Sequence, residues 1–155
     1  MEGLEGTSST LGRKRIDLWW DPDHRESFEL MMSYILSLRT GAIWAKRVVN
    51  LKSVVPDQNA RDHQVEYFRQ LFSHLRLKFK PKIEVEPEGE PHQFLKKYSP
   101  KADMIIAPLK PITDFENHQA FKDYLLQIWN QVPANTHLLA VTSYDLLDHR
   151  EVYSG

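Results

Sequence analysis

The sequence predicts an α/β fold in which strands and helices alternate and form a doubly wound, five-stranded parallel sheet. Two short runs, 15–20 and 103–107, are almost entirely apolar, which is typical of strands buried on both faces of a sheet. Three further strand-like segments alternate with four segments whose apolar residues have helical spacing. Because strand–helix–strand crossovers are right-handed, the simplest order of the strands is 3-2-1-4-5.

The composition indicates one folded globular domain. The chain has 155 residues, and 20 basic against 21 acidic residues give a net charge of -1, so nucleic acid is not expected as a partner. The absence of cysteine excludes disulfides, thiolate metal sites and a cysteine nucleophile. No apolar run reaches the roughly 20 residues of a membrane helix. We expect residues 1–13 to be a disordered linker or expression tail, residues 14–143 to be the domain, and residues 144–155 to be a C-terminal tail.

The first predicted unit is the strand 15–20 with the helix that follows it over 26–38. Aromatic and β-branched residues fill the strand, and Trp19 and Trp20 are predicted core residues. Apolar residues at helical spacing make a broad stripe on the helix, which suits a helix lying on a sheet. Gly41 is the expected stop of this helix.

The next two units follow the same pattern. Residues 46–55 are rich in Val and Leu and predict a strand, after which Asp57 is a candidate N-cap for the helix 59–77. Residues 82–86 alternate apolar and charged side chains, as a strand near a sheet edge does. A short helix is expected over 91–98.

The last part of the domain contains the second buried strand, a helix and a final strand. Prolines follow the strand 103–107, and Thr113 with Glu116 has the spacing of a capping box. This predicts a helix over 113–131. Residues 137–142 then form the fifth strand.

Asp17 is the one polar residue in the first strand, and we expect it to be structural. A carboxylate in a central strand must be paired or hydrogen-bonded, either to backbone N–H groups or to a neighbour such as Arg47. A general base is the alternative, but a mid-strand position does not point to the rim of the sheet. The tryptophans are expected in the core, with an exposed partner anchor as the alternative for Trp44; they are Trp19, Trp20, Trp44 and Trp129.

A ligand site in such a sheet is expected at the carboxyl ends of the strands where the winding direction reverses. Here that crevice lies between the loops 21–24 and 108–111. The candidate ligand-binding residues of this switch-point crevice are Asp21, Asp23, His24 and Lys110.

Nucleotide, metal and catalytic roles are disfavoured at this crevice. A phosphate cradle needs glycine, but the glycines occupy positions 3, 6, 12, 41, 89 and 155, outside both loops. Asp21, Asp23 and His24 resemble cation ligands, yet acids near a helix N-terminus that complement its dipole explain them better. The histidines lack metal spacing, and no Gly-x-Ser-x-Gly motif is present. The sequence therefore predicts no cofactor, no metal and no enzymatic activity.

The order of these motifs resembles the cytosolic C-terminal domain of cation–chloride cotransporters, the sodium–potassium–chloride carrier family. The string Ile-Asp-Leu-Trp-Trp at 16–20, followed by the helix segment 30–36, carries the resemblance most specifically. It continues through 60–77, resumes at 102–109 in Ala-Asp-Met-Ile-Ile-Ala-Pro-Leu, and ends at 138–141 in Leu-Leu-Ala-Val. These pieces span nearly the whole predicted domain.

The resemblance implies a fold similar to universal stress proteins without their glycine-rich nucleotide loop. It further implies a non-catalytic regulatory and assembly role at the cytoplasmic face of the cell membrane. The implied partners are the transmembrane transporter domain, a sister cytosolic lobe and a second copy in a homodimer. A universal-stress-like sensor that binds a nucleotide or another anion at the switch point is the alternative. The first hypothesis predicts an exposed apolar face, and the second predicts an open pocket.

Overall fold

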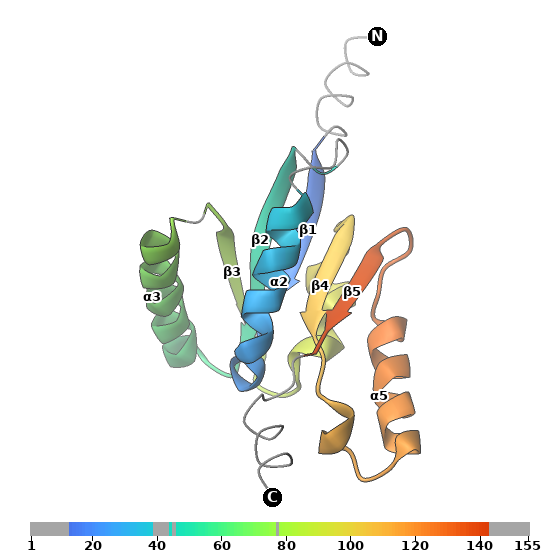
Figure 1. Cartoon of the computed structure of the whole chain (residues 1–155). Helices are drawn as coiled ribbons and strands as arrows, with labels where there is room; N and C mark the ends of the chain where they lie inside the picture. The colour runs from blue at the N-terminus through green and yellow to red at the C-terminus, as the bar shows by residue number, and fades with distance from the viewer. Residues whose placement is uncertain (1–12, 39–43, 45, 77, 143–155) are drawn as a thin grey trace, which may run out of the picture.

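In the computed structural model, which describes residues 13–38, 44, 46–76 and 78–142, five parallel strands form one sheet in the order β3-β2-β1-β4-β5 (Figure 1). The predicted fold class and strand order are therefore confirmed. The strands are β1 (Lys14–Trp19), β2 (Arg47–Val55), β3 (Lys80–Val85), β4 (Met104–Pro108) and β5 (His137–Val141). The α-helices are α2 (Glu26–Ser37), α3 (Gln58–Leu75), α4 (Leu95–Tyr98) and α5 (His118–Asn130), joined by the 3₁₀ turns η1 (Pro22–His24), η3 (Pro91–Phe94) and η4 (Ile112–Asp114).

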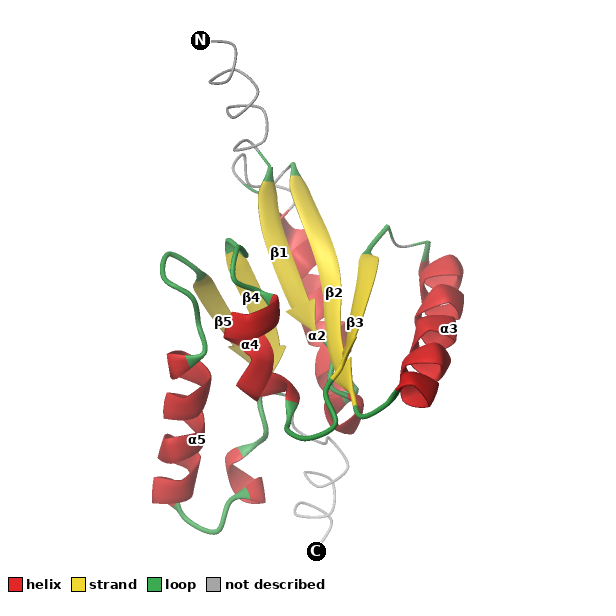
Figure 2. Cartoon of the chain, turned by 180° about the vertical axis from the view of Figure 1, so that it is seen from behind, coloured by secondary structure: helices red, strands yellow, loops and turns green. Residues whose placement is uncertain are grey.

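Helices lie on both faces of the sheet, with α2 and α3 on one face and α4 and α5 on the other (Figures 1 and 2). Successive side chains of an extended chain point to opposite faces, so Trp19, the last residue of β1, and Trp20, which follows it, enter two different cores. Trp20 contacts Phe28 of α2 and Phe68 of α3, with ring centroids 5.1 and 5.4 Å away. Trp19 belongs to the other core, with Leu95 of α4 and Tyr124 of α5. Both tryptophans are buried, Trp19 at 1% and Trp20 at 3% exposure.

Asp17 is fully buried, and its partners come from the neighbouring strand β2. The Asn50 side-chain amide donates to one carboxylate oxygen over 3.0 Å, and the Lys52 ammonium lies 4.0 Å from the other. The register explains the choice, because Asp17 lies opposite Asn50, whereas Arg47 lies opposite Lys14, three residues away. The predicted structural role therefore stands, but Arg47 was the wrong partner to name.

Two sequence predictions about aromatic packing and capping need correction. Trp129 is 64% exposed, because the inward stripe of α5 runs through Tyr124 and Ile128 and the next residue lies about 100° around the helix. Trp44, by contrast, is partly buried against the α2–α3 core, which does not favour the exposed-anchor alternative.

The capping box predicted at Thr113 and Glu116 does not form. Residues 112–114 make the 3₁₀ turn η4, and α5 begins only at His118, after Asn117, whose side chain accepts a hydrogen bond from the Ala120 amide over 2.8 Å. Phe115 explains the shift, since its extended backbone brings its ring to 4.9 Å from the Tyr124 ring. Asp57, in contrast, is the N-cap of α3 as predicted, accepting from the Ala60 amide over 2.7 Å.

Some predictions fall outside the described residues, namely the two tails at 1–12 and 143–155 and the helix stop at Gly41. Within the described part of the chain, no helix combines the length and the apolar character that a membrane crossing requires.

Candidate functional site

The switch-point crevice predicted from the sequence is a small cavity at the carboxyl ends of β1 and β4. Residues that line it include Trp19, Asp21, His92, Ala107, Lys110 and Tyr124. The cavity measures about 290 Å³ when the open solvent at its mouth is counted. The enclosed space that can hold the centre of a water molecule is only about 10 Å³. That is room for about one water molecule. A nucleotide does not fit this conformation.

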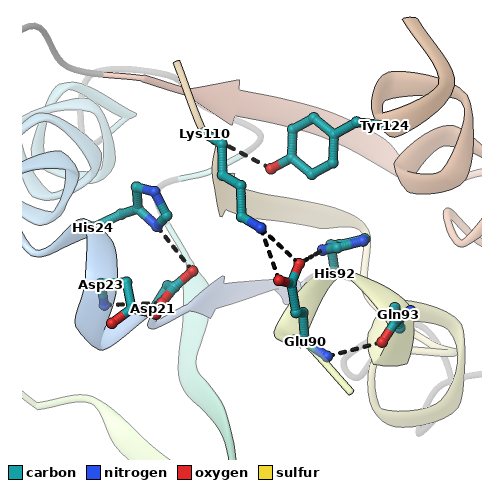
Figure 3. Close-up of polar contacts among 8 residues, drawn as sticks. All are labelled: Asp21, Asp23, His24, Glu90, His92, Gln93, Lys110 and Tyr124. Carbon is teal, nitrogen blue, oxygen red and sulfur yellow. Dashed lines mark hydrogen bonds and ion pairs between the residues drawn. The ribbon is translucent and has the colours of Figure 1, made fainter. Parts of the chain in front are cut away.

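The loop after β1 satisfies its own polar groups (Figure 3). One carboxylate oxygen of Asp21 accepts from the Asp23 amide over 3.0 Å and so caps η1, and the other lies 3.0 Å from Nδ1 of the buried His24. Asp23 is exposed and does not line the cavity. The capping interpretation of these acids is thus the one the geometry favours. Among the described residues, no group of three acidic, histidine or cysteine side chains could hold a metal ion.

Lys110 is held by Glu90, which approaches from the loop before η3 (Figure 3). The Lys110 ammonium lies 2.8 Å from each Glu90 carboxylate oxygen, and Nδ1 of His92 lies 3.3 Å from one of them. The hydrogen bond from Lys110 holds the pKa of Glu90 below its usual value. Burial lowers the pKa of His92 despite the nearby Glu90 charge, so this imidazole favours its neutral form.

Tyr124 completes the crevice from α5. Its hydroxyl accepts a hydrogen bond from the Lys110 backbone amide over 3.1 Å, and its ring lies 5.8 Å from the Lys110 ammonium. Burial raises the pKa of this tyrosine, so it stays protonated. The His92 ring meets the Tyr124 ring edge to face, with the ring centroids 5.1 Å apart. These contacts bind the end of β4, η3 and α5 into one unit.

The sequence prediction missed Glu90, His92 and Tyr124. A signal for Glu90 was present, because Glu90 and Gln93 have capping-box spacing with a proline between them. In the structure Glu90 caps η3, and its amide donates to the Gln93 side chain over 2.8 Å. Gly89, at φ 110°, makes the turn that a Cβ would block, since one placed there would lie 2.8 Å from the Phe94 ring.

The charged side chains of this crevice are already paired within the chain. Asp21 and Lys110 reach the same cavity as predicted, His24 is held against Asp21, and Asp23 is elsewhere. Each charged group that lines the cavity already has an internal partner of opposite or titratable character. The side chains of the crevice therefore hold the end of β4, η3 and α5 together, and they do not form an open ligand site.

A second candidate site is the outer surface formed by α5 and β5, at one end of the sheet (Figure 1). Leu125, Leu126 and Trp129 of α5 are 37%, 57% and 64% exposed. They lie within roughly 100° of the helix circumference, so they form one apolar stripe. The neighbouring strand β5 ends the sheet and is apolar from Leu138 to Val141.

Comparisons with known proteins add no family assignment. No family model matches the chain, and no curated protein matches it at a significant level. A function therefore has to be supported by the closed crevice, the apolar outer surface and the sequence strings themselves.

Proposed function

We propose that the chain is a non-catalytic regulatory and assembly domain from the cytoplasmic side of a cation–chloride cotransporter, and that it acts by protein–protein packing. The support is the string Ile-Asp-Leu-Trp-Trp at 16–20, the string at 102–109, and a five-stranded parallel α/β sheet, which is the class of fold that this resemblance implies. Packing against a second copy, a sister lobe or the transporter shifts the conformational balance of the carrier when it favours one state.

The observation that carries the proposal is the exposed apolar stripe of Leu125, Leu126 and Trp129 on α5. Exposed apolar side chains are common singly, but a contiguous group with a large aromatic residue is typical of an interaction site. The three side chains do not serve the core, which α5 reaches through Tyr124 and Ile128. They are available to a partner.

The two edges of the sheet differ in a way that also favours packing through β5. The edge strand β3 carries Lys80, Pro81 and Lys82, residue types that block pairing with another strand. From Leu138 to Val141, β5 carries neither charge nor proline, and no strand in the described part of the chain pairs with its outer side. Two copies related by a two-fold axis would pair β5 with β5 in antiparallel fashion and bring both α5 stripes together.

Sedimentation velocity over a concentration series tests this packing. The proposal expects a monomer–dimer equilibrium that Leu126→Glu with Trp129→Glu weakens at least about 10-fold, because each change removes an apolar side chain worth about 1.5 kcal/mol or more. Ser73→Glu with His74→Glu, which adds two acidic groups at exposed positions of α3 at the other end of the sheet, is the matched control and should leave the equilibrium within about twofold. A chain that stays monomeric at about 0.5 mM, far above the 1 μM typical of specific pairs, would contradict self-packing.

The alternative, a universal-stress-like sensor of nucleotides or anions, has one favourable observation, the Lys110 ammonium at the switch-point cavity. Thermal-shift titration with ATP, AMP and magnesium separates the two, because a ligand that binds the native state raises the melting temperature. A saturable rise that Lys110→Gln abolishes would replace the assembly proposal. A flat response to millimolar ligand favours it.

A further inference from the structure

One face of the sheet is bare over β2 and β3. Figure 2 views this face: α4 and α5 lie on it toward β4 and β5, and no helix in the described part of the chain lies over β2 and β3. Parallel sheets are almost always covered on both faces, because crossover helices pack on each side. Here the connection from β3 to β4 supplies only η3 and α4, so a helix-wide strip of sheet is left open.

The register identifies the side chains on this bare face. Lys52 points to it, since its ammonium donates to the Tyr98 carbonyl of α4 over 2.8 Å. Cross-strand partners share a face, so Lys82, opposite Lys52, and Lys80, opposite Asn50, lie there too. Arg15, two residues before Asp17 in β1, joins them.

The exposed charges of this face are mostly basic although the whole chain is nearly neutral. Arg15, Lys80 and Lys82 are exposed, Glu84 is half-buried, and the other acidic side chains already have partners, Asp17 in Lys52 and Glu86 in Lys97 and Tyr98 of α4. Burial lowers the pKa of Lys52, and the charges of Lys82 and Arg15 lower it further, while Asp17 and Glu84 oppose them. Lys52 is paired with Asp17 at 4.0 Å, so the exposed basic side chains of this face are Arg15, Lys80 and Lys82.

We propose that the bare face of β2 and β3, together with Arg15 near the start of β1, is a docking surface for an acidic segment of a partner protein. Charge complementarity selects an acidic occupant, because Arg15, Lys80 and Lys82 repel a basic one. The shape selects a protein segment over a membrane, since α4 stands above the sheet beside the bare strip (Figure 2) and a flat bilayer would meet α4 first. An extended or helical segment can instead lie alongside α4 and cover β2 and β3.

Binding of a fluorescein-labelled acidic amphipathic peptide of about 20 residues, which spans about 30 Å as a helix, provides the test. We expect anisotropy to report saturable binding that weakens with salt. Lys80→Glu with Lys82→Glu should raise Kd at least about 10-fold, and the neutral pair Lys80→Gln with Lys82→Gln should raise it less. The matched control is Lys101→Glu with Lys122→Glu, which changes the net charge equally at two exposed sites away from this face.

The proposal further expects the Lys52 pKa, followed by NMR, to rise when the peptide is bound, because an acidic neighbour favours the charged ammonium. Equal loss of affinity in the Lys80/Lys82 and Lys101/Lys122 variants would overturn the proposal as non-specific attraction. Binding to vesicles that contain phosphatidylserine, with none to the peptide, would overturn it in favour of a membrane surface. Far-UV circular dichroism of each variant confirms that the fold is retained.

Discussion

Replacement of Asp17 by alanine should cost this domain about 3 kcal/mol of unfolding free energy, because it would leave two buried groups without their partner. The Asn50 amide would lose its acceptor at 3.0 Å, and the Lys52 ammonium, whose side chain is only 12% exposed, would lose its counter-charge at 4.0 Å. Asp17 itself is fully buried in the central strand, so its partners would be left unpaired away from bulk solvent.

The magnitude follows from two contributions. Leaving one buried polar group unpaired costs about 1–3 kcal/mol, and breaking a buried ion pair costs about 3–5 kcal/mol. The ion-pair contribution falls below its usual range here, because Lys52 keeps its hydrogen bond to the Tyr98 carbonyl and the ion pair is long, so the two contributions together come to about 3 kcal/mol. Asp17→Asn retains an acceptor for Asn50 and should cost about 1–2 kcal/mol. A loss of 3 kcal/mol lowers the melting temperature of a chain of this size by about 6–12 °C.

Urea unfolding followed by tryptophan fluorescence measures these differences, since Trp19 and Trp20 report on the two cores of the sheet. Asp23→Ala is the matched control, and its exposed side chain should change stability by less than about 0.5 kcal/mol. The expected order of stability is wild type, then Asp17→Asn, then Asp17→Ala. An alanine variant as stable as the control would refute the pairing of Asp17 with Asn50 and Lys52.

Two further predictions concern a cap and a titrating side chain. Asp57→Ala removes the acceptor for the Ala60 amide at the start of α3 and should destabilise the domain by about 1 kcal/mol in urea unfolding. Because burial lowers the pKa of His92, the unfolded chain binds more protons just below the usual value of 6.5, so stability should fall as pH falls through that window. His92→Gln should flatten that part of a stability–pH curve measured from pH 5 to 7, and an unchanged slope would contradict the assignment.

The strand order and most elements were predictable because their signals are local. The runs at 15–20 and 103–107 are apolar on both faces, and that pattern occurs only where helices cover a strand twice. Trp129 and Thr113 were mispredicted for the opposite reason. The burial of a residue on α5 depends on how the helix is rotated against the sheet, and the rotation is set by Phe115 and Tyr124, which are not adjacent in sequence.

The candidate site was predictable only in part, for the same reason. The contact of Asp21 with His24 spans three residues, so the sequence places them together. Lys110 and Glu90 are 20 residues apart, and their contact depends on where the connection between β3 and β4 crosses the sheet. No spacing rule gives that geometry. The strand alternation did place Asp17 in the sheet, but the choice of Asn50 over Arg47 depended on the register between β1 and β2.

The distribution of satisfied and unsatisfied groups argues for a domain that acts through its surface. At the switch point, Glu90 holds Lys110 and Asp21 holds His24, so the usual ligand site of this fold is filled by the chain's own side chains. On the outside, Trp129 and Leu126 are exposed beside an unprotected edge strand, and Lys80 and Lys82 lie on a bare sheet face. Selection for stability alone would bury Trp129 and Leu126 and would give Lys80 and Lys82 acidic partners. Partners that cover both surfaces would explain why the chain keeps them exposed.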